Sequence, residues 1–202
     1  MKGELKIVKL IGITGGIASG KTTVDKMVRK AGYKVIDSDS IAHEILLDPA
    51  VIKTVAATFG SSVIENDQVN RKALGELIFM SPAKQQQLNR IIHPLVKERI
   101  KQDIQKMPNE QIVFVDVPLL YEANMERDFD QIIVVYISEK LQLERLIGRD
   151  DITMNYAIAK MNRQMSIEDK IRQADFLINN EGSYEHTEQQ VKDIIRRIKD
   201  EI

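Results

Sequence analysis

The chain has 202 residues, which is enough for one domain with an insertion and for a core that folds without disulfides. It contains no cysteine, and this excludes a disulfide framework, a thiol nucleophile and cysteine-ligated zinc. The 29 basic and 30 acidic residues give a net charge of −1, so nucleic acid is not an expected partner. The apolar run near the N-terminus is too short, and its flanks too charged, for a signal peptide or a membrane span. We therefore expect a cytoplasmic protein that does not contact membranes.

The first predicted elements are strands and helices in alternation. An apolar run predicts a strand over residues 7–14, and the following periodic segment predicts a helix over residues 21–31, ended by Gly32. A second, shorter strand is expected over residues 33–36.

Residues 40–108 contain no clear strand pattern and are expected to form a mostly helical insertion. Periodicity and stop signals predict helices over residues 40–47, 51–59, 71–79 and 83–104. We expect the last of these to break at His93, with Pro94 starting a new helix, because proline costs about 3 kcal/mol in a helix interior.

Strands return in the second half of the chain. Apolar runs predict strands over residues 111–117, 131–137 and 176–178, and periodic segments predict helices over residues 140–149, 153–164 and 184–202. The alternation predicts an α/β fold with an open parallel sheet of about five strands flanked by helices, with ligands at the carboxyl ends of the strands. We expect a single domain over residues 1–202, with a core of about residues 1–39, 109–139 and 165–202.

The most specific motif is a phosphate-binding loop of the pattern G-x-x-x-x-G-K-[ST], placed between the first strand and the first helix. Backbone N–H groups of such a loop surround phosphate oxygens, Lys21 can reach the β/γ-phosphates, and the Thr22 hydroxyl can ligate Mg²⁺. The alternative is a glycine-rich turn that packs a strand on a helix and binds nothing. The expected ATP-binding residues are Gly15, Gly16, Ile17, Ala18, Ser19, Gly20, Lys21, Thr22 and Thr23.

Three carboxylates follow the predicted strands and are expected to face this loop. Asp37 and Asp39 come just after the second strand, and Asp116 comes near the end of the third. Such a group can hold Mg²⁺ or deprotonate an attacking hydroxyl. Asp39 is equally a candidate helix N-cap, and Asp116 could be a turn carboxylate in contact with water.

Basic residues could complete a phosphate-transfer site. Arg145 and Arg149 are four residues apart on one predicted helix and could clamp phosphate oxygens together. They could equally belong to a solvated face, paired with acidic neighbours such as Asp150. Arg90 and His93 also share a helix face, although a histidine in this position is more often a local hydrogen-bonding group than a ligand.

Five segments in chain order resemble the dephospho-coenzyme A kinase family, and together they are more specific than the loop alone. They are the segments starting at Gly12 (GITGGIASGKT), Val35 (VIDSDSIAH), Ile91 (IIHPLV), Asp116 (DVPLLYE) and Ala174 (ADFLINN). The resemblance implies a P-loop kinase fold. It also implies transfer of the ATP γ-phosphoryl group to the ribose 3′-hydroxyl of dephospho-coenzyme A, with Mg²⁺ as cofactor and with ATP and dephospho-coenzyme A as partners.

The resemblance also implies roles for particular residues. Asp39 corresponds to the general base, with Asp37 beside it, and residues 140–164 correspond to a mobile lid that carries Arg145 and Arg149 as catalytic groups alongside Lys21. Asn180 corresponds to an adenine-side residue. Residues 40–108 correspond to the acceptor-binding region. The implied acceptor-binding residues are Asp37, Arg71, Arg90, His93, Pro118 and Leu119, and the implied metal ligands are Thr22 and Asp116.

Two departures from the family pattern affect the expected site. Ala18 replaces a usual glycine, which fits if its φ angle is negative, and Lys160 replaces an expected arginine and so lacks the planar bidentate fork. Alternatives are another small-molecule kinase of the shikimate type or a nucleotide-binding module without catalysis. A regulatory GTPase is disfavoured because its Asn-Lys-x-Asp motif is absent. We expect a monomer or a weak homo-oligomer.

Overall fold

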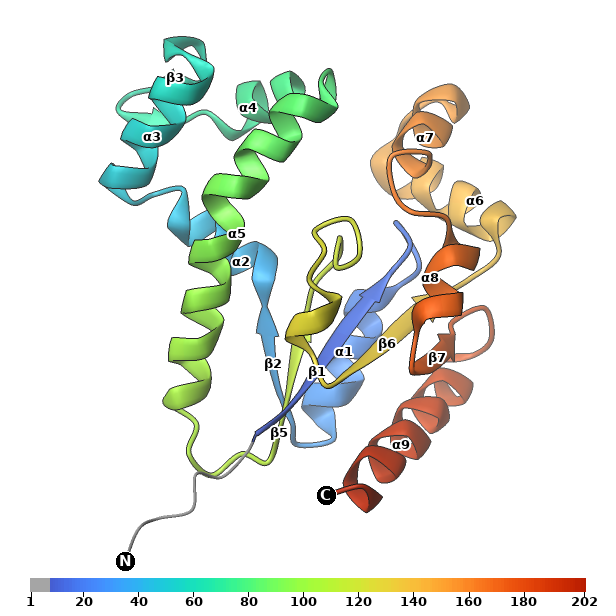
Figure 1. The fold of residues 1–202 in the computed structure, drawn as a ribbon. Coiled ribbons are helices and arrows are strands. Elements are labelled where there is room, and N and C mark those ends of the chain that lie inside the picture. The colour runs from blue at the N-terminus through green and yellow to red at the C-terminus, as the bar shows by residue number, and fades with distance from the viewer. Residues whose placement is uncertain (1–7) are drawn as a thin grey trace, which may run out of the picture. The chain divides into compact units, whose positions relative to one another are not determined.

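The computed structural model describes residues 8–202, so residue 7, the first of the predicted N-terminal strand, lies outside the described part (Figure 1). The chain divides into two compact units. The sheet unit comprises the chain up to Ile36 and from Asn109 onwards, and the helical unit comprises Asp37–Pro108.

A five-stranded sheet organises the sheet unit and confirms the predicted α/β class. Strand β1 pairs in parallel with β5 and β6, and β6 pairs in parallel with β7, in the overall order β2-β5-β1-β6-β7. The register places Ile13 opposite Asp116 on one side and opposite Ile133 on the other. The strands are β1 (Lys9–Gly15), β2 (Lys34–Asp37), β5 (Ile112–Asp116), β6 (Gln131–Tyr136) and β7 (Phe176–Asn179).

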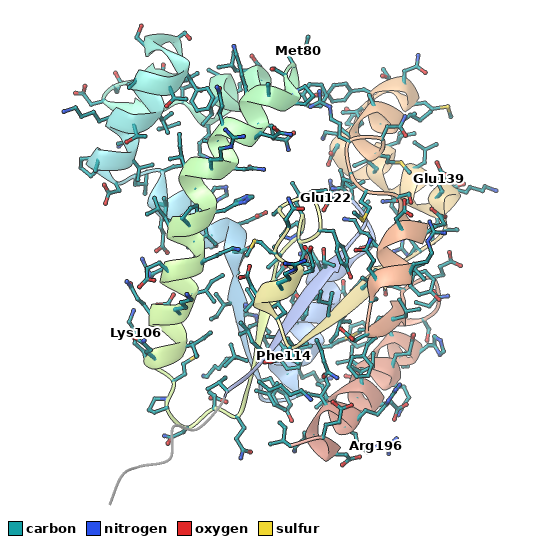
Figure 2. The ribbon with its side chains drawn as sticks, in the orientation of Figure 1. Met80, Lys106, Phe114, Glu122, Glu139 and Arg196 are labelled. Atoms are coloured by element: carbon teal, nitrogen blue, oxygen red, sulfur yellow. The ribbon has the colours of Figure 1, made fainter. Side chains whose placement is uncertain are left out.

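The core forms where apolar strands meet two amphipathic helices, α1 (Lys21–Lys30) and α9 (Tyr184–Asp200). Strand β5 is buried along its whole length, as expected for a central strand of a parallel sheet. Its Phe114 lies in the sheet, whereas Glu122 lies beyond the carboxyl end of that strand (Figure 2). The Tyr33 ring meets Phe114 edge-on, with ring centroids 5.5 Å apart.

Three helices connect β6 to β7: α6 (Glu139–Asp150), α7 (Met154–Met161) and α8 (Ile167–Gln173) (Figure 1). Side chains cap two of them, since Thr153 accepts from a backbone N–H of α7 and Ser166 from one of α8. Helix α8 was not predicted, because its seven residues are too few to show a clear apolar period. A short 3₁₀ turn, η2 (Glu126–Asp128), precedes β6.

The helical unit contains four α-helices, one fewer than predicted. They are α2 (Ser38–Ile45), α3 (Pro49–Phe59), α4 (Arg71–Phe79) and α5 (Pro82–Gln105). The predicted break at His93 was wrong, because α5 is continuous with Pro94 inside it. Ile92, Val96 and Ile100 lie four residues apart and are all buried, so packing along one face of α5 offsets the hydrogen bond that proline removes.

The expectation of no strand in this unit was also wrong. A short antiparallel hairpin pairs β3 (Ile64–Glu65) with β4 (Gln68–Val69), after the 3₁₀ turn η1 (Ser61–Val63). Asn66 and Asp67 form its turn with φ angles of 49° and 59°. Asparagine and aspartate tolerate this left-handed region, which a two-residue hairpin requires. Among the described residues, no helix is long and apolar enough to cross a membrane.

Candidate active site

The phosphate loop connects β1 to α1 and contains two left-handed residues. Gly20, the N-cap of α1, has a φ of 84°, and Ala18 has a φ of 59°. The expectation of a negative φ at Ala18 was therefore wrong, since the tight turn places an alanine where glycine is preferred. Position 15 requires glycine because the backbone of β6 lies close to it, and an added Cβ would lie 2.4 Å from the Val135 carbonyl oxygen. The loop leads directly into the N-terminus of α1, where backbone N–H groups and the helix dipole favour an anion.

Lys21 lies against a pair of carboxyl groups. Its ammonium group forms an ion pair with Asp116, at the carboxyl end of β5, and both side chains are largely buried. Asp25, one turn further along α1, is hydrogen-bonded to Asp116, and its Oδ1 atom is buried without a partner. Burial and the adjacent Asp116 charge raise the pKa of Asp25 to about 8, although Lys21 acts in the opposite direction.

Asn180 joins the loop to the end of β7. Its Nδ2 atom donates to the Ser19 carbonyl oxygen at 2.8 Å, and its Oδ1 atom accepts from the Thr187 hydroxyl at 2.9 Å. Arg145 donates to the Asn180 carbonyl oxygen at 3.2 Å. The fold therefore brings together three of the predicted site groups, namely the loop, Asn180 and Arg145.

Arg149 has a different environment from Arg145. It is more than half exposed, and its Nε atom donates to Asp150 at 2.7 Å. Lys160 also donates to Asp150, at 2.7 Å, so the lysine that departs from the family pattern joins α7 to the end of α6. Hydrogen bonds from Arg149, then from Lys160, lower the pKa of Asp150 to about 2. Arg149 therefore forms the ion pair with Asp150 that the alternative of a solvated helix face predicts.

The remaining predicted residues of the sheet unit lie in the turn after β5 and in the first turn of α1. The Thr14 hydroxyl donates to the Pro118 carbonyl oxygen at 3.2 Å, which fixes the turn after β5, and Leu119 is exposed beside it. Thr22 is exposed in the first turn of α1, and the Thr23 N–H donates to the Gly20 carbonyl oxygen at 2.9 Å.

Asp37, predicted to bind the acceptor, and Asp39, predicted as the general base, both lie in the helical unit. Asp37 caps α2, because its side chain accepts from the Ser40 N–H at 3.0 Å. The expectation that the helix begins near Ser40, with Asp39 as a candidate cap, was wrong, since α2 begins at Ser38. Asp39 is an exposed carboxylate in the first turn of α2, so capping does not account for it.

Three basic groups of the helical unit complete the predicted set. Arg71 lies 2.6 Å from the His43 Nε2 atom, and Arg90 is exposed on α5. Burial, then the charge of Lys97, lowers the pKa of His93, so this half-buried imidazole favours its neutral form.

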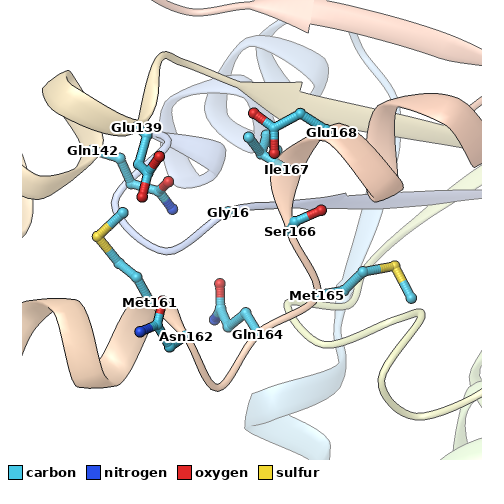
Figure 3. A pocket seen from close by; sticks show the side chains of 10 residues that line it. All are labelled: Gly16, Glu139, Gln142, Met161, Asn162, Gln164, Met165, Ser166, Ile167 and Glu168. Atoms are coloured by element: carbon cyan, nitrogen blue, oxygen red, sulfur yellow. The ribbon is translucent and has the colours of Figure 1, made fainter.

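Sequence reasoning missed a group of residues behind the loop. Gln164 accepts a hydrogen bond from the Ile17 N–H at 2.8 Å, and Lys170 donates to the Gly15 carbonyl oxygen at 3.2 Å. A cavity of about 330 Å³ separates Gly16 and Gln142 from the turn that follows α7 (Figure 3). Figure 3 shows Gln164 pointing from this turn toward the loop at Gly16. Gln164 is the last residue of the family's Ala-Arg-Ile-x-x-Gln pattern, in which Lys160 replaces the arginine, and this pattern was the only sequence signal for Gln164.

Fold and site together define a class of protein. A parallel sheet whose first strand leads into a phosphate loop, with a lysine and an arginine at that loop, is the architecture of a P-loop kinase. Residues 9–186 match a family model described as dephospho-CoA kinase. The chain belongs to the dephospho-CoA kinase family, a family of ATP-using enzymes of coenzyme A biosynthesis.

Individual relatives agree with this assignment. A dephospho-CoA kinase of Enterococcus faecalis is 43% identical over 190 residues, which are 92% of this chain and 95% of that protein. The solved structure of TT1252 from Thermus thermophilus has a TM-score of 0.84 at 28% identity, covering 95% of this chain and 98% of that one. A dephospho-CoA kinase from Campylobacter jejuni has a TM-score of 0.70 at 29% identity, with the same coverage of 95% and 98%.

Proposed function

We propose that this protein transfers the γ-phosphoryl group of ATP to the ribose 3′-hydroxyl of dephospho-coenzyme A, which gives coenzyme A and ADP. The observation that carries the proposal is the folded phosphate loop with Lys21 held at its end by Asp116, in a chain that matches the family over residues 9–186. Phosphoryl transfer depends mainly on positioning and on neutralising charge. A loop of this motif at the N-terminus of a helix, with an adjacent lysine, is suited to both.

The other predicted site residues are assigned proposed roles according to their side-chain chemistry. Arg145, hydrogen-bonded beside the loop, and Arg149, exposed at the end of α6, are proposed to neutralise charge on the transferred group. Asn180 is proposed to lie on the adenine side. Asp39 is proposed to accept the proton of the attacking hydroxyl, because it is an exposed carboxylate that the N-cap role does not explain.

Mg²⁺ fits the residues present near Lys21. Mg²⁺ prefers oxygen ligands and is usually held by one or two protein groups together with substrate phosphates. No group of three or more potential metal-ligating side chains occurs among residues 8–202, so an all-protein cage is not part of the proposal. The Thr22 hydroxyl and Asp116 would hold the ion, and the buried unpartnered Oδ1 of Asp25 adds an oxygen beside Asp116. When bound, Mg²⁺ would neutralise charge on the phosphate oxygens.

Acceptor-binding roles are proposed for residues of the helical unit and, separately, for residues of the turn after β5. Arg71 and Arg90 offer fixed positive charge, and neutral His93 offers a hydrogen-bonding ring. Pro118 and the exposed Leu119 would supply apolar contact. The acceptor carries phosphate groups, which suit guanidinium side chains.

The direct test is the initial rate of ADP release from Mg-ATP, with mass spectrometry of the product. Dephospho-coenzyme A is compared with AMP, adenosine, shikimate and no acceptor. Phosphate added to dephospho-coenzyme A alone supports the proposal. Preference for another acceptor would favour a different small-molecule kinase, and tight ATP binding without any acceptor-dependent release would favour a binding module.

The role of Asp39 is tested by the substitution Asp39→Asn. Because the amide cannot accept the proton, turnover should fall by about 100-fold or more while ATP binding is retained. Asp67→Asn, in the β3–β4 turn of the same unit, is the matched control and should retain full activity. Unchanged turnover in Asp39→Asn would remove Asp39 from the base role.

A further inference from the structure

Residues 164–170, which follow α7, contact the beginning of the phosphate loop at two points. The Ile17 N–H donates to the Gln164 side-chain oxygen at 2.8 Å, and the Lys170 ammonium group donates to the Gly15 carbonyl oxygen at 3.2 Å. One contact therefore fixes a donor of the loop and the other fixes an acceptor.

Lys170 is completely buried, and its charge is balanced. Glu122, in the segment after β5, pairs with it at 2.9 Å. The same Glu122 oxygen accepts from the Met165 N–H at 2.9 Å, so this carboxylate joins the turn after β5 to the stretch between α7 and α8. An ion pair withdrawn from water adds little net stability, because desolvation offsets the attraction. The main effect of the Glu122–Lys170 pair is therefore geometric, because it holds the Lys170 ammonium group against the phosphate loop.

These contacts act on successive peptide groups of the loop. The Gly16 carbonyl oxygen accepts from the Ser19 N–H at 3.1 Å, so both polar groups of the Gly16–Ile17 peptide are fixed once Gln164 holds the Ile17 N–H. Lys170 fixes the carbonyl of the preceding residue, Gly15. A loop that binds phosphate must keep its carbonyl oxygens turned away from the anion, because a rotated peptide would replace an attractive dipole with a repulsive one.

We propose that Gln164 and Lys170 are positioning residues that hold Gly15, Gly16 and Ile17 in the conformation that binds nucleotide. Nucleotide affinity then depends on the stretch directly after α7, a segment that contributes no predicted nucleotide contact of its own. The inference rests on the proposed function only in that the loop binds a nucleotide. It makes no use of the acceptor.

The first test compares Gln164→Leu with Gln173→Leu. The first variant removes the acceptor that holds Ile17, whereas the second makes the same chemical change on α8, where the side chain contacts Met165 and Asp169 and not the loop. Calorimetry gives the dissociation constant of Mg-ADP, and thermal unfolding without nucleotide gives Tm. Loss of one hydrogen bond should raise the dissociation constant about fivefold or more in Gln164→Leu and less than twofold in Gln173→Leu.

If Gln164 only stabilised the fold, Gln164→Leu would lower Tm, but the two variants would bind Mg-ADP equally well at temperatures far below Tm. The expected result is therefore a weaker affinity in Gln164→Leu at a Tm within a few degrees of Gln173→Leu. An affinity within twofold of the unsubstituted protein, or an equal loss in both variants, would overturn the role of Gln164.

Lys170 is tested by the double variant Lys170→Met with Glu122→Gln. Removing both members of the pair leaves no uncompensated buried charge, and the new glutamine can still accept from the Met165 N–H. We expect the dissociation constant of Mg-ADP to rise by about tenfold. A folded double variant with unchanged affinity for Mg-ADP would overturn the role of Lys170. If the double variant does not fold, the result for Gln164→Leu alone decides whether the proposal stands.

The outcome is separable from the proposed kinase activity. Mg-ADP binding by the unsubstituted protein without phosphorylation of dephospho-coenzyme A would defeat the proposed function and leave this inference testable in full. Absence of Mg-ADP binding would overturn both.

Discussion

Lys21, the first residue of α1, forms an ion pair with Asp116, the last residue of β5. The two residues come close because β1, which leads into the phosphate loop, pairs with β5 and places Ile13 opposite Asp116. Asp25 completes the group from the next turn of α1. The lysine proposed to contact the ATP phosphates is therefore also the cation that compensates the largely buried Asp116 carboxylate. Its removal should affect catalysis and stability separately.

Lys21→Met should lower kcat/KM for ATP by about 100-fold or more, because the variant loses the charge nearest the transferred phosphoryl group. It should also lower Tm, since the largely buried Asp116 carboxylate loses its cation. Adding Asp116→Asn should restore Tm without restoring activity. Steady-state rates and thermal unfolding measure the two effects, with exposed Lys26→Met as the control. Activity close to that of the control would contradict the role of Lys21.

The sequence predicted features whose signal is local. The loop motif, the buried strands and most helices depend on neighbouring residues, and these predictions were confirmed. The continuous course of α5 through Pro94 depends on packing of its buried face, which a propensity argument does not contain. Gln164 and Lys170 contact loop residues that lie 147 and 155 positions away, so no spacing rule could connect them. The roles of Asp39, Arg149 and Asn180 remain predictions.

Arg149→Met should lower kcat by about 100-fold with a smaller effect on ATP affinity, because a guanidinium group that neutralises transferring charge acts mainly in the transition state. Arg149 pairs with Asp150 and is more than half exposed, so the substitution should change Tm little. Single-turnover rates and calorimetry with Mg-ADP separate chemistry from binding. Arg196→Met, at an exposed position of α9, is the control. An unchanged kcat would show that Arg149 has no catalytic role and only forms a surface ion pair with Asp150.

The pKa of Asp25 predicts a pH-dependent stability. Because its pKa rises from 3.8 to about 8 on folding, the folded protein binds a proton that the unfolded chain releases between these values. Stability from this group is present at low pH and declines as pH rises through about 8. Asp25→Asn resembles the protonated acid and does not titrate. The Tm of the variant minus that of the unsubstituted protein should therefore increase from pH 5 to pH 8.

Nucleotide-free and Mg²⁺-free protein is used for this comparison, so that ligand binding does not contribute. Asp200→Asn, at the exposed end of α9, is the matched control and should give a constant difference. A difference for Asp25→Asn that also stays constant with pH would show that Asp25 is not protonated in the folded protein at neutral pH.

Ala18 tests whether the loop holds its left-handed conformation in solution. Its φ of 59° costs an alanine about 1 kcal/mol relative to glycine, whereas glycine loses more backbone entropy on folding. Ala18→Gly should therefore raise the free energy of unfolding slightly, by about 0.5 kcal/mol. Ala31→Gly makes the same change at the C-cap of α1, where φ is −76°, and should lower it by about 0.5–1 kcal/mol.

The opposite signs distinguish backbone conformation from the loss of a methyl group, which is common to both variants. Urea unfolding of the two proteins measures the difference, and the affinity for Mg-ADP should stay within twofold in Ala18→Gly, because glycine populates the same conformation without strain. If Ala18→Gly destabilised the protein as much as Ala31→Gly, residue 18 would not be left-handed in solution. The conformation described for the loop that carries the proposed nucleotide contacts would then be contradicted at that residue.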